Sequence, residues 1–111
     1  MLNWSIIKIT TEVKLKEKIM SNMHNPPHPG HVLREWIPKN MSVTSAAKAL
    51  KISRVSLSKI LNANTNISAE MAIRLSQWLG TSSDLWLNMQ VKYDLWQAEQ
   101  KATFHIERLA A

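Results

Sequence analysis

Apolar residues recur along this chain at the three- and four-residue spacing of helices, with polar turns between them. One stripe contains four apolar positions, Val43, Ala46, Ala47 and Leu50. This spacing predicts a helix with one buried face. Ser42 precedes the stripe, where a hydroxyl can accept a hydrogen bond from a helix amide, so we expect the helix to begin there.

A second helix is predicted after a break at residues 51–53. Ser53 is its expected cap, and its inner face carries three apolar residues, Leu57, Ile60 and Leu61. Its outer face is polar and partly basic, with Arg54, Val55, Ser58, Lys59 and Asn62. Two helices joined by a tight turn, with small alanines at the crossing, are typical of a helix-turn-helix. An ordinary helical hairpin in a small bundle is the alternative interpretation.

A helix over about residues 30–37 is expected before this hairpin. Pro29 suits its first turn and Pro38 ends it, because proline tolerates the first helical positions but not the interior. Arg34 and Lys39 fall on its outer side, where we expect them to be solvated; a contact of either with a phosphate is the alternative.

Two further helices complete a predicted all-α, five-helix fold. The fourth helix should begin after a Ser68 cap and end at Gly80. Its apolar stripe includes Met71 and Trp78, which the spacing places in the core. The fifth helix is expected over about residues 82–101, since Thr81 and Asp84 have the spacing of a capping box.

The fifth helix is apolar on two sides. One stripe consists of Leu85, Trp86, Met89, Tyr93 and Trp96, and the other of Leu87, Val91, Leu95 and Ala98. A small monomer needs one stripe to close its core, so we predict that the second forms a homodimer interface. The alternative is that residues 1–22, or the tail from Phe104 onward, fold back and cover it.

The ends of the chain are harder to interpret. Apolar residues alternate over residues 7–15, which suggests a short strand, and a loosely ordered arm is the alternative. We therefore divide the chain into an N-terminal extension with a proline-rich segment (1–27), a helix-turn-helix domain whose last helix dimerises (28–101), and a tail (102–111). Its 111 residues suit one domain.

Charge and composition narrow the functional classes. Residues 29–62 carry a net charge of +5 and residues 63–111 a net charge of −1, so positive charge gathers on the predicted hairpin. The chain has no cysteine, no long apolar run and no export signal, which favours a cytoplasmic protein. His24, His28 and His31 lack metal-ligand spacing, and no catalytic motif is present. We expect no metal, no cofactor, no membrane association and no enzymatic activity.

Four ordered motifs are HPG at 28–30 followed by VLRE at 32–35, SRVSLSKILN at 53–62, ISAEMAIRL at 67–75, and WLNMQ at 86–90 leading to YDL at 93–95. Over about residues 28–100 the chain thereby resembles the HigA/VapI antitoxins of the lambda-repressor-like (XRE) helix-turn-helix superfamily. The family often has Asn-Gly-Lys after the recognition helix, whereas this chain has Asn62, Ala63 and Asn64. A left-handed residue there must be an asparagine or carry strain. His31 stands where the family usually has Glu.

The resemblance implies a homodimer that binds a palindromic operator, represses its own operon and neutralises a HigB-like mRNA endoribonuclease of the RelE superfamily. A free-standing XRE regulator without a toxin is the alternative. In either case we expect the helix that starts at Arg54 to enter the major groove.

Each outward-facing position of the hairpin then has an expected role in DNA binding. Arg54 would read guanine and Val55 a thymine methyl, while Ser58 and Lys59 would read or brace the next positions. Phosphate contacts are predicted for Ser53, Ser56, Thr44 and Asn62, and added point charge for Lys48 and Lys51.

Overall fold

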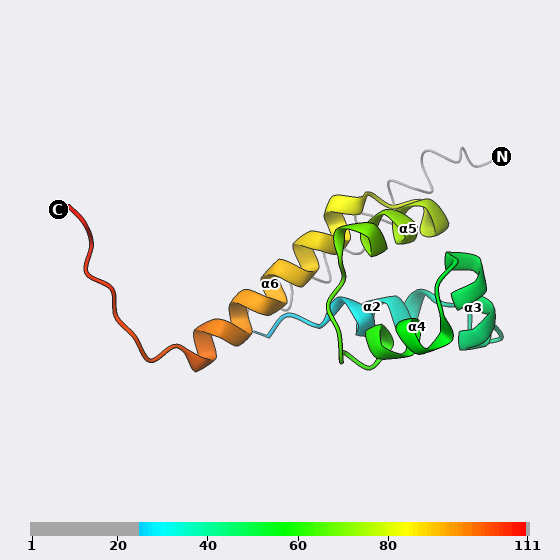
Figure 1. The fold of residues 1–111 in the computed structure, drawn as a ribbon, viewed down its shortest axis with the longest axis horizontal. Helices are drawn as coiled ribbons and strands as arrows, with labels where there is room; N and C mark the ends of the chain where they lie inside the picture. Colours follow the sequence, from blue (N-terminus) through cyan, green and yellow to red (C-terminus); the bar gives the residue numbers. More distant parts are fainter. Residues whose placement is uncertain (1–24, 111) are drawn as a thin grey trace.

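The computed structural model describes residues 25–110, and that part of the chain consists of helices and loops (Figure 1). With the labels of Figure 1, the five helices are α2 (Pro29–Trp36), α3 (Val43–Leu50), α4 (Arg54–Leu61), α5 (Ala69–Leu79) and α6 (Ser83–Lys101). The all-α, five-helix prediction is confirmed. The strand or arm expected at residues 7–15 lies outside the described residues.

The helices begin where short-range sequence signals indicate. The hydroxyls of Ser42, Ser53 and Ser68 each accept a hydrogen bond from the backbone N–H three residues later, at 3.0–3.1 Å. Such a bond satisfies an amide that has no partner within the helix. Pro29 occupies the first position of α2, and Gly80 ends α5 in the left-handed conformation, at φ 74°.

The predicted start of α6 is wrong by one residue. Ser82, rather than Thr81, caps the helix, and its Oγ accepts a hydrogen bond from the Leu85 N–H at 3.2 Å. Thr81 is buried, and its Oγ1 accepts a hydrogen bond from Nε1 of Trp86 at 2.8 Å. A buried indole N–H needs an acceptor, and Thr81 supplies it, so its hydroxyl is directed into the core.

All five helices contribute to one hydrophobic core. Its largest fully enclosed side chains are those of Trp86, Leu33, Leu57 and Leu75. Met71 is buried and Trp78 packs partly buried against the core, as their spacing predicts. The first half of α6 packs against α5 and α2, which leaves α3 and α4 together on the far side from the C-terminal tail (Figure 1).

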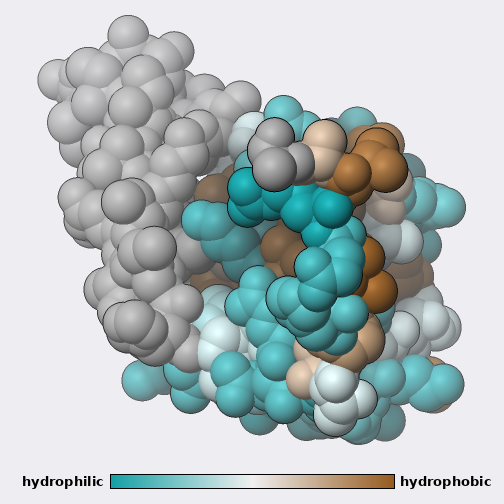
Figure 2. Space-filling view, turned by 90° about the vertical axis from the view of Figure 1, so that its left-hand side faces the viewer, coloured by the Kyte–Doolittle hydropathy of each residue, from teal (hydrophilic) through white to brown (hydrophobic). Residues whose placement is uncertain are grey.

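The second half of α6 leaves this core and continues into an extended tail (Figure 1). In the second apolar stripe, Val91 is 53% and Leu95 56% exposed, whereas Leu87 is half-buried against the core. Phe104 and Ile106 are more than 70% exposed, so the tail does not cover the stripe. Seen from the tail end, hydrophobic side chains reach the surface beside hydrophilic ones (Figure 2).

Candidate nucleic-acid interface

The predicted helix-turn-helix consists of α3, the turn after it and α4, and we call residues 43–61 the recognition hairpin. Ala46 and Ala47 are buried at the crossing, where small side chains let the helices approach closely. The turn at Lys51 has φ 58°, in the left-handed region. The N–H groups of Lys51 and Ile52 donate to the carbonyls of Lys48 and Ala47, which is a Schellman ending of α3.

The α4 helix has a buried side and an exposed side. Leu57, Ile60 and Leu61 face the core. The candidate DNA-binding residues all lie at the surface, exposed except for the half-buried Ser58: Thr44, Lys48, Lys51, Ser53, Arg54, Val55, Ser56, Ser58, Lys59 and Asn62. Val55 is 63% exposed, which leaves its methyl groups available to a partner.

Hydrogen bonds within the hairpin distinguish the two candidate serines at the start of α4. The Ser53 Oγ accepts from the Ser56 N–H at 3.0 Å and donates to the Ser56 Oγ at 2.8 Å. The hydroxyl of Ser53 is therefore used within the cap. Ser56 accepts this bond, so its own hydroxyl hydrogen is the one directed to an outside acceptor.

Asn62 is part of the ending of α4. Its Oδ1 accepts from Nη2 of Arg34 at 2.7 Å, and its Nδ2 donates to the Ser58 Oγ at 3.4 Å. The predicted phosphate contact of Asn62 therefore rests on the remaining amide hydrogen alone.

Ala63 occupies the position of the glycine in the Asn-Gly-Lys segment that often follows a recognition helix. It has φ 60°, a left-handed conformation that a Cβ atom makes unfavourable by about 1–2 kcal/mol. The N–H groups of Ala63 and Asn64 donate to the carbonyls of Ile60 and Lys59 at 3.1 and 2.8 Å, so α4 also ends in a Schellman motif. The sequence left two alternatives for a left-handed residue here, an asparagine or a strained residue. The structure has the strained residue, Ala63.

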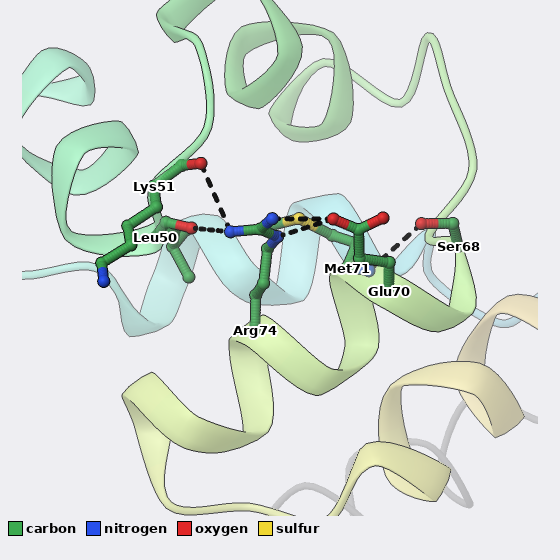
Figure 3. A network of polar contacts seen from close by, with 6 residues as sticks. All are labelled: Leu50, Lys51, Ser68, Glu70, Met71 and Arg74. Carbon is green, nitrogen blue, oxygen red and sulfur yellow. Dashed lines mark hydrogen bonds and ion pairs between the residues drawn. The ribbon is translucent and has the colours of Figure 1, made fainter.

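Two arginines contact the hairpin from outside it, and sequence reasoning missed both contacts. Arg34 of α2 is exposed, as expected, but it also donates to the Leu61 carbonyl and to Asn62. Arg74 of α5 donates to the carbonyls of Leu50 and Lys51 and pairs with Glu70 (Figure 3). No short-range signal reveals these contacts, because each joins residues more than 20 positions apart.

The hairpin has the charge that a polyanion requires. Residues 43–61 contain Lys48, Lys51, Arg54 and Lys59 and no acidic residue. A groove of about 410 Å³ beside α4 is lined by, among others, Ser56, Lys59 and Arg74. Glu70 also lines it, and its carboxylate is engaged by Arg74. The positive field therefore remains largely uncompensated on this face.

Two further findings concern other kinds of site. Within residues 25–110, no three histidine or acidic side chains gather as metal ligands would, and His28 instead caps α2 by accepting from the Gly30 N–H at 2.9 Å. Over the same residues, no helix combines the length and apolarity that crossing a bilayer requires. His24 lies outside the described residues.

The fold and its exposed cationic helix define a helix-turn-helix DNA-binding domain. The family profile described as "Helix-turn-helix" matches residues 33–86. The chain belongs to the XRE-type helix-turn-helix family, which contains HigA antitoxins, virulence-associated proteins and transcriptional regulators, and not enzymes.

Three similar proteins represent these groups. Virulence-associated protein A′ of Dichelobacter nodosus is 41% identical over 81 residues, covering 71% of this chain and 70% of that one. The uncharacterized HTH-type transcriptional regulator YddM of Escherichia coli K12 is 35% identical over 88 residues, covering 78% and 92%. The structure of the Pseudomonas aeruginosa antitoxin HigA with the higBA promoter has a TM-score of 0.69 at 34% identity, covering 78% of this chain and 100% of that one.

Proposed function

We propose that this chain is a homodimeric repressor that binds a palindromic operator upstream of its own gene, and that it acts as the antitoxin of a HigB-like mRNA endoribonuclease. The observation that carries the DNA-binding part is the exposed outer face of α4, which is polar, carries Arg54 and Lys59 and has no acidic residue. The similarity to a HigA structure that contains promoter DNA supports the same conclusion.

On duplex DNA, α4 enters the major groove with its amino end toward the bases. Arg54 at that end donates two hydrogen bonds to a guanine, and the exposed Val55 packs on a thymine methyl. Lys59, one turn further on, reads or braces the next position together with Ser58. Ser56 and Thr44 hold phosphates, and Lys48 and Lys51 add charge to the backbone contacts.

Dimerisation uses the second face of α6. Val91 and Leu95 are more than half exposed and Ala98 is small and exposed, so two copies of this face can approach closely. Leu87 contributes less, because it packs partly against its own core. One recognition hairpin makes few contacts, and two on half-sites about one helical turn apart supply the affinity of an operator complex.

The DNA-binding part is tested by measuring binding to the chain's own upstream region and to a random duplex at two salt concentrations. We expect preference for the upstream region, and affinity for both that falls as salt rises. Arg54→Ala should weaken specific binding by about 1–3 kcal/mol and relax preference at one base pair. Equal losses on both duplexes would make Arg54 a phosphate contact only.

The antitoxin part requires a separate experiment, because the relative YddM is named as a transcriptional regulator and not as an antitoxin. The product of the neighbouring gene should co-purify with this chain. Purified, it should cleave mRNA, and adding the chain should stop the cleavage. If the neighbour encodes no such protein and none co-purifies, the free-standing regulator is the correct assignment.

A further inference from the structure

Reading bases requires that α4 be fixed in rotation as well as in place. The helix has only eight residues, and three apolar side chains hold it to the core, Leu57, Ile60 and Leu61. Apolar burial is strong but non-directional, so it only weakly limits translation of α4 along its axis or rotation about it. A small rotation would move Arg54 and Val55 away from the base edges they face.

The turn that leads into α4 is anchored by Arg74 of α5. Its Nη1 donates to the Leu50 carbonyl at 3.0 Å and to the Lys51 carbonyl at 3.3 Å (Figure 3). Its Nε and Nη2 both donate to the Glu70 Oε1, at 3.3 and 2.7 Å. Glu70 thus fixes the plane of the guanidinium, and the fork reaches carbonyls at the end of α3 that have no partner within that helix.

The opposite end of α4 is anchored by α2. Arg34 donates from Nη2 to the Leu61 carbonyl at 3.2 Å and to the Asn62 Oδ1 at 2.7 Å. One turn earlier on α2, Gly30 lies directly against α4, since a Cβ atom there would be only 1.8 Å from the carbonyl oxygen of Ile60. The backbone of α2 therefore rests on the last turn of α4.

The two anchors share a chemistry. Each places a guanidinium at the carbonyl end of a hairpin helix, where positive charge is favoured by the helix dipole. Each also bridges residues 23–28 positions apart in sequence, so it joins the hairpin to a different part of the core. Arginine suits this task because its planar fork donates in fixed directions, whereas lysine offers a flexible point charge.

We propose that Arg34 and Arg74 are positioning residues that hold the carboxyl end of α4 and the turn that leads into α4, and so determine preference for the operator over other DNA rather than affinity for phosphate. This inference rests on the proposed function as a sequence-specific DNA-binding protein. Glu70 has a supporting role, because it orients Arg74.

The test compares charge-conserving variants of the full chain with a matched lysine control. Arg34→Lys and Arg74→Lys keep the positive charge and lose the fork, while Lys48→Ala removes an exposed charge from α3. For each protein the dissociation constants for the upstream region and for a random duplex are measured over a salt series. The constant for the random duplex divided by the constant for the upstream region gives the specificity ratio.

For both arginine variants we expect the ratio to fall about tenfold, with random-duplex binding and the salt dependence unchanged. For Lys48→Ala we expect weaker binding to both duplexes, an unchanged ratio, and a salt slope lower by about 0.9. Glu70→Gln should give an intermediate fall in the ratio, and it provides a milder probe of Arg74 if Arg74→Lys is unfolded at the assay temperature.

Three results would overturn the inference. If both duplexes are bound more weakly at an unchanged ratio, the two guanidinium groups contact phosphates, and if neither affinity changes they do not position α4. If the wild-type chain itself does not prefer its upstream region, the proposed function fails and the inference fails with it. The wild-type ratio therefore separates the two failures.

Discussion

Both halves of α6 contain large apolar residues, but their surroundings differ. Leu85, Trp86, Met89 and Gln90 in the first half are buried. In the second half, Val91 and Leu95 are more than half exposed. The two halves belong to one continuous helix, so the difference arises from what packs against them.

The first half closes the core of the single chain, and the second half extends past the end of that core except where Tyr93 meets the His28 ring. We therefore expect substitutions up to Gln90 to act mainly on folding, and substitutions of the exposed Val91 and Leu95 to act mainly on the proposed association. In the first stripe Leu85, Trp86 and Met89 are buried, whereas Val91 and Leu95 of the second stripe are exposed. The predictions below test whether the boundary lies there.

The largest effect is expected from two tryptophans ten residues apart on α6. Trp86 is fully buried, and Trp86→Ala should lower the free energy of unfolding by about 3–5 kcal/mol. Trp96 is half-buried, and Trp96→Ala should cost about 1 kcal/mol. Urea unfolding of dilute protein measures both. Equal losses would show that the core continues into the second half.

A charge on the second half should act on association instead. Leu95→Asp places a carboxylate in the proposed interface twice, once from each copy, and we expect the dimer dissociation constant to rise about 100-fold. Sedimentation equilibrium measures it, and unfolding of the dilute chain should be nearly unchanged. Ile73→Asp is the matched control, because Ile73 is an exposed apolar residue on α5. A Leu95→Asp protein that still dimerises like wild type would exclude this face.

Gln90 marks the boundary between the halves. Its Oε1 accepts from the Ile67 N–H at 2.8 Å, and its Nε2 donates to Asn66 and Asp94 at 3.1 and 2.9 Å. Gln90→Leu would leave the buried Ile67 amide without an acceptor, so we expect a loss of about 1–3 kcal/mol in unfolding free energy. Gln90→Glu keeps the acceptor but sets a buried carboxylate against that of Asp94, so it should also lose stability. If both variants unfold like wild type, this contact does not contribute to stability.

The residues above show which features a sequence can reveal. Caps such as Ser42, Ser53 and Ser68 were predicted because the hydroxyl and the amide it accepts from are three residues apart. The two stripes of α6 were likewise predicted, because apolar residues recur in them every three or four positions. The contacts that join Arg34 to Leu61, Arg74 to Leu50 and Gln90 to Ile67 were not, because each spans more than 20 residues and depends on how the helices pack.

The smallest effect concerns His28, which joins α2 to the second half of α6. Its Nδ1 accepts from the Gly30 N–H, and its ring meets the edge of Tyr93 with centroids 4.9 Å apart. Burial, and next the nearby His31, lower the pKa of His28 below its ordinary value of 6.5, while Asp94 and the Thr65 backbone oppose them. The folded chain therefore favours the neutral ring, which keeps Nδ1 as an acceptor.

The sign of the pH dependence follows from this lowered pKa. Below about pH 6.5 the unfolded chain takes up a proton at His28 that the folded chain resists, so unfolding is favoured as the pH falls toward the lowered pKa. Above 6.5 this contribution to stability is fully present. Urea unfolding at pH 7.5 and 5.5 should show a loss at the lower pH that is smaller in His28→Asn, since asparagine also caps helices but does not titrate. The same loss in both proteins would assign the pH dependence to other groups, and His28 would then link α2 to α6 without sensing protons.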